Sequence, residues 1–363
     1  MFFRSKKLSN DDKRLADIAA AVAIFFELKD ASGIVVLLLN DAHYTVKLPF
    51  VCASLHDDLK AHLAEQAGFA DLQFTIEHNV PIYASKVEHL SNVKNIIAIS
   101  SGKGGVGKSA TAVNLALGLK AQGARVGILD ADIYGPSVPL MLGTAGESPQ
   151  SPDNKHMFPI NALGLASNSI GYLVKNDHAS IWRGPMASKA LSQLAKETRW
   201  PLLDYLIVDM PPGTGDIQLT MAQQLPLTAS VIVTTPQDIA LSDAEKGIAM
   251  YNKLELPVLG MVENMSYFEC PECHHQTPIF SSHGAHRLSE KYALPMLAEV
   301  PLNTVIREYA DSGKSLIDEQ PEHAISKIYK QAALRLSMQI STQLSVSETA
   351  QALANKIEVT RLD

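Results

Sequence analysis

Short apolar runs alternate with segments of helical spacing over most of the chain, from about residue 95 onward. Each run is short enough for a strand that is buried on both faces. Strand, loop and helix repeated in this order predict an α/β fold with a mostly parallel, doubly wound sheet. The predicted strands are residues 96–100, 126–130, 205–209, 230–234, 258–264 and 296–299.

The first part of the chain, residues 11–88, has a different pattern that predicts a small α/β domain. Residues 40–43, of which three are polar, lie between two apolar runs and predict a hairpin turn, and residues 80–93 are typical of a linker. The predicted helices and strands of this domain are residues 15–28, 33–39, 44–50, 55–67 and 72–77.

Composition restricts the class of protein. The chain has 363 residues, of which 46% are hydrophobic and 19% charged, and this fits a folded protein of more than one domain. No run approaches the roughly 18 apolar residues of a membrane span, and polar residues 10–14 lie where a signal peptide needs its apolar region. The net charge of −7 argues against nucleic-acid binding. We expect a cytoplasmic protein that binds neither nucleic acid nor membrane.

A glycine-rich turn follows the strand predicted at residues 96–100 and precedes a helix-forming segment. Its glycines let backbone N–H groups converge on an anion, and the helix N-terminus adds a positive end. Lys108 would reach the β- and γ-phosphates, and the Ser109 hydroxyl would ligate Mg²⁺. The predicted nucleotide site consists of Gly102, Lys103, Gly104, Gly105, Val106, Gly107, Lys108, Ser109 and Ala110.

Polar side chains end three of the other predicted strands. Asp130 and Asp132 could support Mg²⁺ and orient the attacking water, or they could simply cap a strand-to-helix turn. Asp209 ends an apolar strand and would support Mg²⁺, with a Pro- and Gly-rich loop at residues 210–216 that can rearrange when the γ-phosphate leaves. The Asn264 amide suits the edge of adenine, although Asn is also common in turns.

The chain has three cysteines, so a disulfide framework is not expected. Cys270 and Cys273 have a spacing that chelates a metal, but they fill only half of a four-ligand shell. His283 and His286 could complete a zinc site. A second copy of the pair in a two-fold dimer would instead give the four thiolates of a 4Fe–4S cluster, and a redox dithiol would need no metal.

Residues 103–109, with a second lysine inside the phosphate loop, resemble the deviant Walker A motif of SIMIBI-class ATPases, the group of the Min, Par and nitrogenase iron proteins. The wider combination of motifs resembles the Mrp/ApbC branch, whose members are iron–sulfur cluster carriers, over about residues 93–340. The further motifs that carry this resemblance are residues 130–137, 182–185, 209–216, 263–266 and 270–273.

The resemblance implies an ATP-hydrolysing homodimer that holds a 4Fe–4S cluster between its subunits. The cluster would be bridged by Cys270 and Cys273 of both copies and passed to apoproteins, with cluster assembly scaffolds as further partners. The implied alternative functions are a partitioning ATPase, which leaves the cysteine pair unused, and an ATP-dependent reductase, which keeps its cluster.

The same resemblance assigns roles to individual residues. Lys103 would be the signature lysine that crosses to the partner's nucleotide, and Lys108 would bind phosphate; with Asp132 as the switch I carboxylate they form the catalytic set. The remaining implied roles are Mg²⁺ ligation by Ser109, support of Mg²⁺ through water by Asp209, and contact with adenine by Asn264.

The chain is accordingly expected to comprise a small α/β domain with its linker (residues 1–88), a P-loop ATPase domain (89–345) and a helical tail (346–363). The first of these is similar, over roughly residues 11–78, to the iron–sulfur-assembly domain often fused to this family. Cys52 lies near the position of that domain's reactive cysteine, but a lone cysteine beside apolar residues is also typical of a core. Arg183 either binds a phosphate or a partner, or packs with its head in solvent.

Overall fold

The computed structural model describes residues 10–40, 42–83, 85, 90–173, 184–281 and 284–344. The chain forms two compact units, one up to Pro81 and one from Ile82 onward. Arg183, His283 and the helical tail expected at residues 346–363 lie outside the described residues. None of the helices in the described part combines the length and the apolar character that a membrane span needs.

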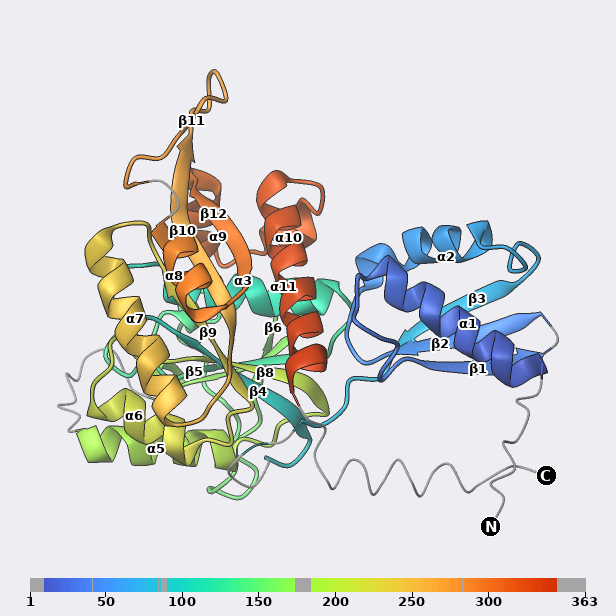
Figure 1. Ribbon diagram of the computed structural model, residues 1–363. Helices are drawn as coiled ribbons and strands as arrows, with labels where there is room; N and C mark the ends of the chain where they lie inside the picture. The colour runs from blue at the N-terminus through green and yellow to red at the C-terminus, as the bar shows by residue number, and fades with distance from the viewer. Residues whose placement is uncertain are drawn as a thin grey trace, which may run out of the picture. The chain divides into compact units, whose positions relative to one another are not determined.

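The first unit is a three-stranded sheet covered by two helices (Figure 1). The hairpin predicted between its first two strands is present, because β1 and β2 are antiparallel, while β3 runs parallel to β2. The alternate apolar residues of β2, Tyr44, Val46 and Leu48, are buried. The elements are α1 (Asn10–Phe25), β1 (Val35–Asn40), β2 (His43–Leu48), α2 (His56–Glu65) and β3 (Gln73–His78).

Cys52 lies in the core of this first unit. Its side chain is 1% exposed, and burial raises the pKa of the thiol to about 12. The thiolate, which is the reactive form of cysteine, is therefore strongly disfavoured. This environment agrees with the core interpretation of Cys52 and not with that of a reactive cysteine.

The second unit is built on a nine-stranded sheet in the order β11-β10-β9-β4-β8-β5-β7-β6, with β12 also paired to β10. Seven strands are parallel, and only β6 and β11 run antiparallel to their neighbours. The predicted mostly parallel sheet is thus confirmed. The strands are β4 (Val93–Ser100), β5 (Val126–Asp130), β6 (Ile160–Ala162), β7 (Leu165–Ser169), β8 (Leu203–Asp209), β9 (Ala229–Thr234), β10 (Val258–Glu269), β11 (Gln276–Thr277) and β12 (Met296–Leu302).

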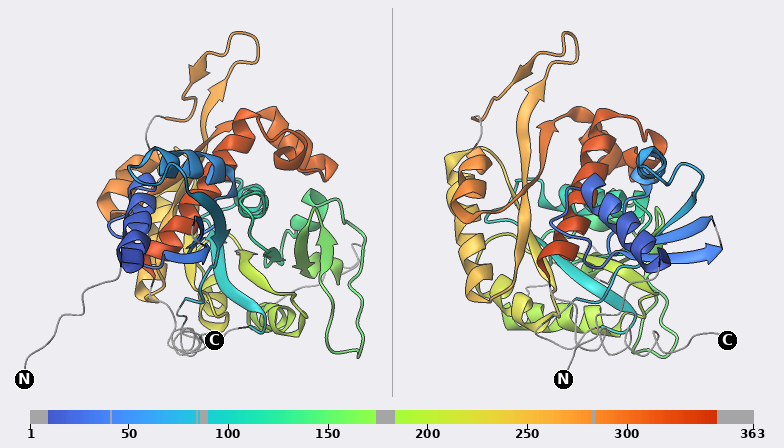
Figure 2. Two further views of the ribbon diagram at one scale, coloured as in Figure 1. Left: turned by 90° about the vertical axis from the view of Figure 1, so that its right-hand side faces the viewer. Right: turned by 45° about the vertical axis from the view of Figure 1, so that its right-hand side comes forward.

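Helices cover both faces of this sheet, as the views in Figures 1 and 2 show. On one face, α5 to α8 bury apolar side chains in a single cluster with the central strands. On the other face, α3 packs against α11 and against strands β5 and β8. The helices are α3 (Lys108–Ala121), α4 (Val138–Met141), α5 (Gly184–Glu197), α6 (Asp216–Gln224), α7 (Asp238–Lys253), α8 (Gly284–Tyr292), α9 (Thr304–Ser312), α10 (Leu316–Glu319) and α11 (Ala324–Gln343).

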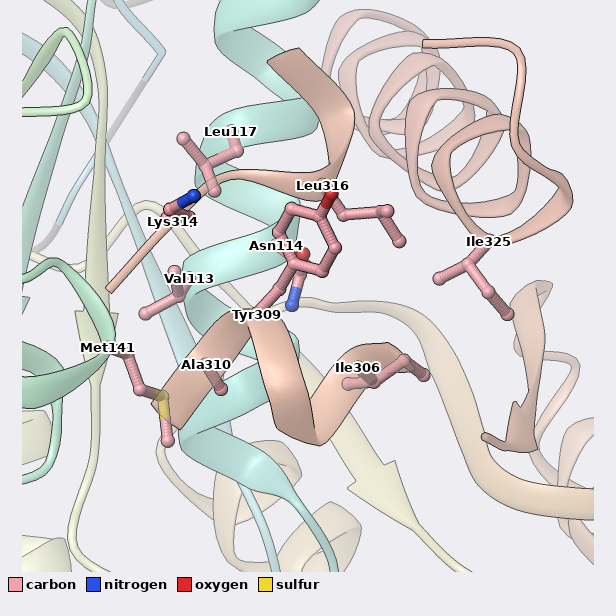
Figure 3. Close-up of a pocket in the computed structure, with 10 residues that line it drawn as sticks. All are labelled: Val113, Asn114, Leu117, Met141, Ile306, Tyr309, Ala310, Lys314, Leu316 and Ile325. Atoms are coloured by element: carbon pink, nitrogen blue, oxygen red, sulfur yellow. The ribbon is translucent and has the colours of Figure 1, made fainter. Parts of the chain in front are cut away.

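The packing of α3 against the C-terminal helices is close. Figure 3 shows Val113, Asn114 and Leu117 of α3 facing Ile306 and Tyr309 of α9 around a cavity of about 10 Å³. Such a cavity has room for about one water molecule. This side of α3 therefore supports the fold and leaves no room for a molecule much larger than water.

Three strands were not predicted, namely β6, β7 and β11, and β10 is longer than predicted. Strands β6 and β11 have only three and two residues, too few to show a pattern. Strand β7 has the sequence Leu-Ala-Ser-Asn-Ser, which is mostly polar, yet its last three residues are fully buried. They are accommodated by hydrogen bonds to residues distant in sequence, such as the 2.7 Å bond from Asn168 Nδ2 to Thr198 Oγ1.

Candidate functional site

The glycine-rich turn lies between the carboxyl end of β4 and the first residue of α3, which is Lys108. Gly105 and Gly107 both have φ of +80°, a conformation that the turn needs and that a side chain would strain. A Cβ atom on Gly107 would also lie 2.1 Å from Asn264 Nδ2. The turn can therefore approach its neighbours only because these positions carry no side chain.

The turn borders a hollow of about 230 Å³. Its lining includes Asp132, Pro212 and most of the predicted nucleotide-binding residues, namely Lys103, Gly104, Gly105, Gly107, Lys108, Ser109 and Ala110. Two predicted members are absent from the lining. Gly102 packs against the backbone of Asp243 on α7, and the Val106 side chain is buried. The sequence thus locates the hollow, and the structure assigns these two residues to its support.

Lys108 lies between two carboxylates. Its Nζ donates a hydrogen bond of 2.5 Å to Asp209 Oδ1 and lies 3.6 Å from Asp132 Oδ2. It also lies 3.3 Å from Ser109 Oγ. The structure therefore brings Lys108, Ser109, Asp132 and Asp209 together at one point, although they come from the ends of three different strands.

Asp209 is fully buried, and burial raises the pKa of its carboxyl group while the Lys108 ammonium opposes that rise. Its second oxygen, Oδ2, is buried without a hydrogen-bond partner among the described residues. Burying such an atom costs free energy unless a ligand satisfies it. An oxygen of this kind beside the Ser109 hydroxyl fits the oxygen-donor preference of Mg²⁺ and its water ligands.

The two aspartates after β5 have different environments. Asp130 is fully buried and accepts hydrogen bonds from the backbone N–H of Asp132 (3.1 Å) and Val138 (3.2 Å) and from Ser169 Oγ (3.0 Å). Burial and then the Asp209 charge raise the pKa of Asp130 to about 7. Asp132 reaches the hollow. Asp130 therefore has the capping role considered from the sequence, and Asp132 has the position of the functional carboxylate.

Two other segments of the second unit are hydrogen-bonded to the phosphate loop. The Gly213 N–H, in the Pro- and Gly-rich loop after β8, donates to the Ser101 carbonyl at 2.9 Å. Asn264 Nδ2, on β10, donates to the Val106 carbonyl at 2.9 Å. The loop after β8 and strand β10 are thus both hydrogen-bonded to the segment that would bind phosphate.

The cysteine pair lies in the turn between β10 and β11, on a hairpin that projects beyond the sheet (Figures 1 and 2). Cys270 directly follows β10, and Cys273 is exposed. Backbone N–H groups of Cys273 and Glu272 lower the pKa of the Cys270 thiol, which favours the thiolate that binds metals. Glu269 is the last residue of β10, and its Oε1 lies 2.9 Å from His274 Nδ1. This contact stabilises the turn.

The zinc alternative has no support in the described part of the chain. His286 Nε2 lies 2.6 Å from Glu299 Oε1, and His283 lies outside the described residues. No group of three or more histidine, cysteine, aspartate or glutamate side chains there is arranged to hold a metal ion. Within one described subunit, Cys270 and Cys273 could supply two ligands of a four-ligand shell.

Comparison with known proteins identifies the family. Residues 92–337 match the family model described as ParA, NUBPL iron-transfer P-loop NTPase. The chain belongs to this family. The iron-sulfur cluster carrier protein of Escherichia coli K12 is 54% identical over 308 residues, which are 83% of each chain. The iron-sulfur cluster transfer protein NUBPL of Dictyostelium discoideum is 46% identical over 74% of this chain and 82% of its own.

Solved structures agree with the P-loop NTPase fold. A nucleotide-binding protein from Archaeoglobus fulgidus in complex with ADP has 35% sequence identity and a TM-score of 0.56, over 65% of this chain and 91% of its own. The cell division ATPase MinD of Pyrococcus furiosus shares the fold, with 22% identity and a TM-score of 0.50 over 67% and 98% of the two chains. The chain is thus a nucleotide-binding P-loop NTPase.

Sequence reasoning assigned no role to Glu263, Ser169 or Glu269. Glu263 is fully buried and bonds both Ser266 and the N-terminus of α8. Ser169 lies on the unpredicted strand β7, where it contacts Asp130. A glutamate within a buried strand was the available signal for Glu263, because such a residue needs partners.

Proposed function

We propose that this protein binds and hydrolyses ATP and carries a 4Fe–4S cluster that two copies of the chain hold between them. The observation that supports the proposal is that one unit has both a hollow at its glycine-rich loop and a Cys270/Cys273 pair, which would fill half of a four-thiolate cluster shell. The carrier and transfer names of relatives at 54% and 46% identity support it. The recipients would be apo iron–sulfur proteins, with cluster assembly scaffolds as donors.

The phosphate site would work through positioning and charge. On ATP binding, Lys108 would exchange its carboxylate partners for β- and γ-phosphate oxygens. Asp209 would then be free to support Mg²⁺ through Oδ2, the oxygen that has no hydrogen-bond partner among the described residues. Ser109 and Asp209 would hold Mg²⁺, whose chemistry here is to neutralise phosphate charge. Asp132 borders the same hollow and orients the attacking water.

Lys103 and Asn264 would complete the ATP site. Lys103 lines the hollow, and none of the ion pairs among the described residues involves it. We assign it to the partner's nucleotide, where its charge stabilises the transition state. Asn264 contacts adenine in this proposal, from a strand that already touches the phosphate loop.

A two-fold homodimer is needed because one subunit supplies only two thiolates. The hairpin segment also exposes apolar side chains beside the cysteines, namely Phe268 (36%), Ile279 (53%) and Phe280 (39%). Exposed apolar groups of this kind are typical of an interaction surface. A cytoplasmic location, expected from the sequence, stays a prediction.

The direct test is transfer of a reconstituted cluster to an apo-ferredoxin under anaerobic conditions. We expect the Cys270→Ser/Cys273→Ser variant to bind ATP normally and to transfer no cluster, whereas the matched control Cys52→Ala transfers as the wild type does. Transfer by the double variant at the wild-type rate would refute the cluster assignment. A wild-type cluster that stays bound while ATP drives electron delivery would favour the reductase alternative.

A further inference from the structure

Strand β10 connects the two sites of the second unit. Asn264 lies on this strand and contacts the phosphate loop through Val106, and Cys270 directly follows the strand's last residue, Glu269. The strand is also the one from which the hairpin projects (Figure 1). A movement of Asn264 on nucleotide binding can therefore be transmitted along the backbone of β10 to the cysteine pair.

The strand is irregular at a specific point between the two sites. Met265 has φ of +54°, a left-handed conformation that is uncommon for a residue other than glycine. The pairing with β12 shifts register between Asn264 and Phe268, so this stretch forms a bulge. A strained, irregular backbone persists only where its surroundings hold it in place.

Glu263 supplies that support. Its side chain is fully buried; Oε1 accepts a hydrogen bond of 2.7 Å from Ser266 Oγ, and Oε2 accepts one of 2.7 Å from the Ala285 N–H. One bond reaches across Met265 to Ser266 within the bulge, and the other fixes the strand to the N-terminus of α8. None of the ion pairs among the described residues involves Glu263, and the mechanism of ATP hydrolysis does not use it.

We propose that Glu263 is a positioning residue that couples the nucleotide site to the thiolate pair by holding the bulge at Met265 rigid. The inference rests on the proposed function, because it assumes that ATP contacts Asn264 and that Cys270 and Cys273 are the cluster ligands. With the bulge fixed, movement of Asn264 passes to the hairpin. If the bulge is flexible, the backbone at Met265 changes conformation instead, and the movement of Asn264 does not reach the hairpin.

The test measures the alkylation rate of each cysteine in the reduced, cluster-free full-length protein, with and without Mg²⁺ and a saturating non-hydrolysable ATP analogue. N-ethylmaleimide is the probe, peptide mass spectrometry resolves the cysteines, and buried Cys52 is the internal reference. We expect the analogue to change the wild-type rate at Cys270 and Cys273 by about fivefold, at the lower end of usual coupling between sites. In Glu263→Gln and in Met265→Gly, the ratio of rates with and without analogue should fall close to one.

The matched control is Asn154→Gly, which replaces another left-handed residue, with φ of +57°, between α4 and β6 and outside both the lining of the hollow and the cysteine hairpin. It should keep the wild-type ratio. Analogue affinity, thermal unfolding and iron content after reconstitution are measured for every variant. A merely structural role for Glu263 would lower the unfolding temperature while leaving the ratio unchanged.

Two outcomes would overturn the proposal. One is a wild-type labelling rate that does not respond to the analogue; the other is a full wild-type ratio in both Glu263→Gln and Met265→Gly. Either result leaves the proposed function intact if the wild type still takes up iron. Failure of the wild type to take up iron would instead contradict the proposed function, and the labelling ratio would still report on the coupling.

Discussion

The Lys108 ammonium lies 2.5 Å from Asp209 Oδ1 at the centre of the phosphate loop, and both side chains are buried. The lysine that would bind phosphate is thus neutralised by the carboxylate that would support Mg²⁺. Such an arrangement keeps both charges paired before ATP arrives, since an unpaired buried charge is costly. In the proposed complex, phosphate oxygens of ATP would replace Asp209 as the partner of Lys108, and Mg²⁺ would replace Lys108 as the partner of Asp209.

The first prediction concerns this pair. Lys108→Met should abolish ATP binding and lower the free energy of unfolding by about 3 kcal/mol, because it leaves the Asp209 carboxylate buried without its cation. Adding Asp209→Asn to that variant should recover much of the lost stability but none of the binding. Urea unfolding and fluorescent-nucleotide titration measure the two effects. Equal stability of Lys108→Met and the wild type would show that the pair contributes nothing to the nucleotide-free state.

The second prediction concerns Asp130 and pH. Burial and the Asp209 charge raise the pKa of Asp130 from 3.8 to about 7, so the folded state holds a proton that the unfolded state has lost between these values. The contribution of this group to stability is therefore present below pH 3.8 and is lost as the pH rises through about 7.

Asp130→Asn removes this titration, so its free energy of unfolding should depend less on pH than that of the wild type between pH 5 and pH 8. Chemical unfolding of the nucleotide-free protein across this range measures both profiles. Ser169→Ala, which removes one hydrogen bond to Asp130 but no titrating group, is the control. Parallel profiles for Asp130→Asn and the wild type would contradict the raised pKa of Asp130.

The third prediction concerns cysteine reactivity. In the reduced native protein, iodoacetamide should modify Cys270 far faster than Cys52. Backbone N–H groups lower the pKa of the Cys270 thiol, whereas burial raises that of Cys52 to about 12 and denies access to it. Peptide mass spectrometry over a time course gives both rates. Fast labelling of Cys52 in the folded protein would mean that the thiol is accessible and would revive its role as a reactive cysteine.

The sequence predicts much of the ATP site because local pattern determines it. Apolar runs mark the central strands, and the residues at their carboxyl ends, including Lys108, Asp132 and Asp209, must meet at one edge of a parallel sheet. Strand β7 could not be predicted from a local pattern of apolar residues. Its buried Ser167, Asn168 and Ser169 are satisfied by partners elsewhere in the chain, which no local pattern reveals.

The supporting residues of the site depend on the fold in the same way. The long-range partner of Glu263 is the Ala285 N–H, which the folding of α8 onto β10 brings to 2.7 Å from its Oε2. For Cys52 the resemblance left a reactive role open while its apolar neighbours favoured a core role, and its burial in the folded unit supports the core role. Long-range contacts, rather than sequence spacing, decide both.

The central claim is that two copies of this chain together hold one cluster through Cys270 and Cys273. The most direct measurement is anaerobic reconstitution with iron and sulfide, followed by determination of molecular mass and of iron per mole of chain. The account predicts a dimer with about four iron atoms, two per chain, and a thiolate-to-iron absorbance band that the Cys270→Ser/Cys273→Ser variant lacks. A monomer that holds tightly bound zinc and no iron would contradict it.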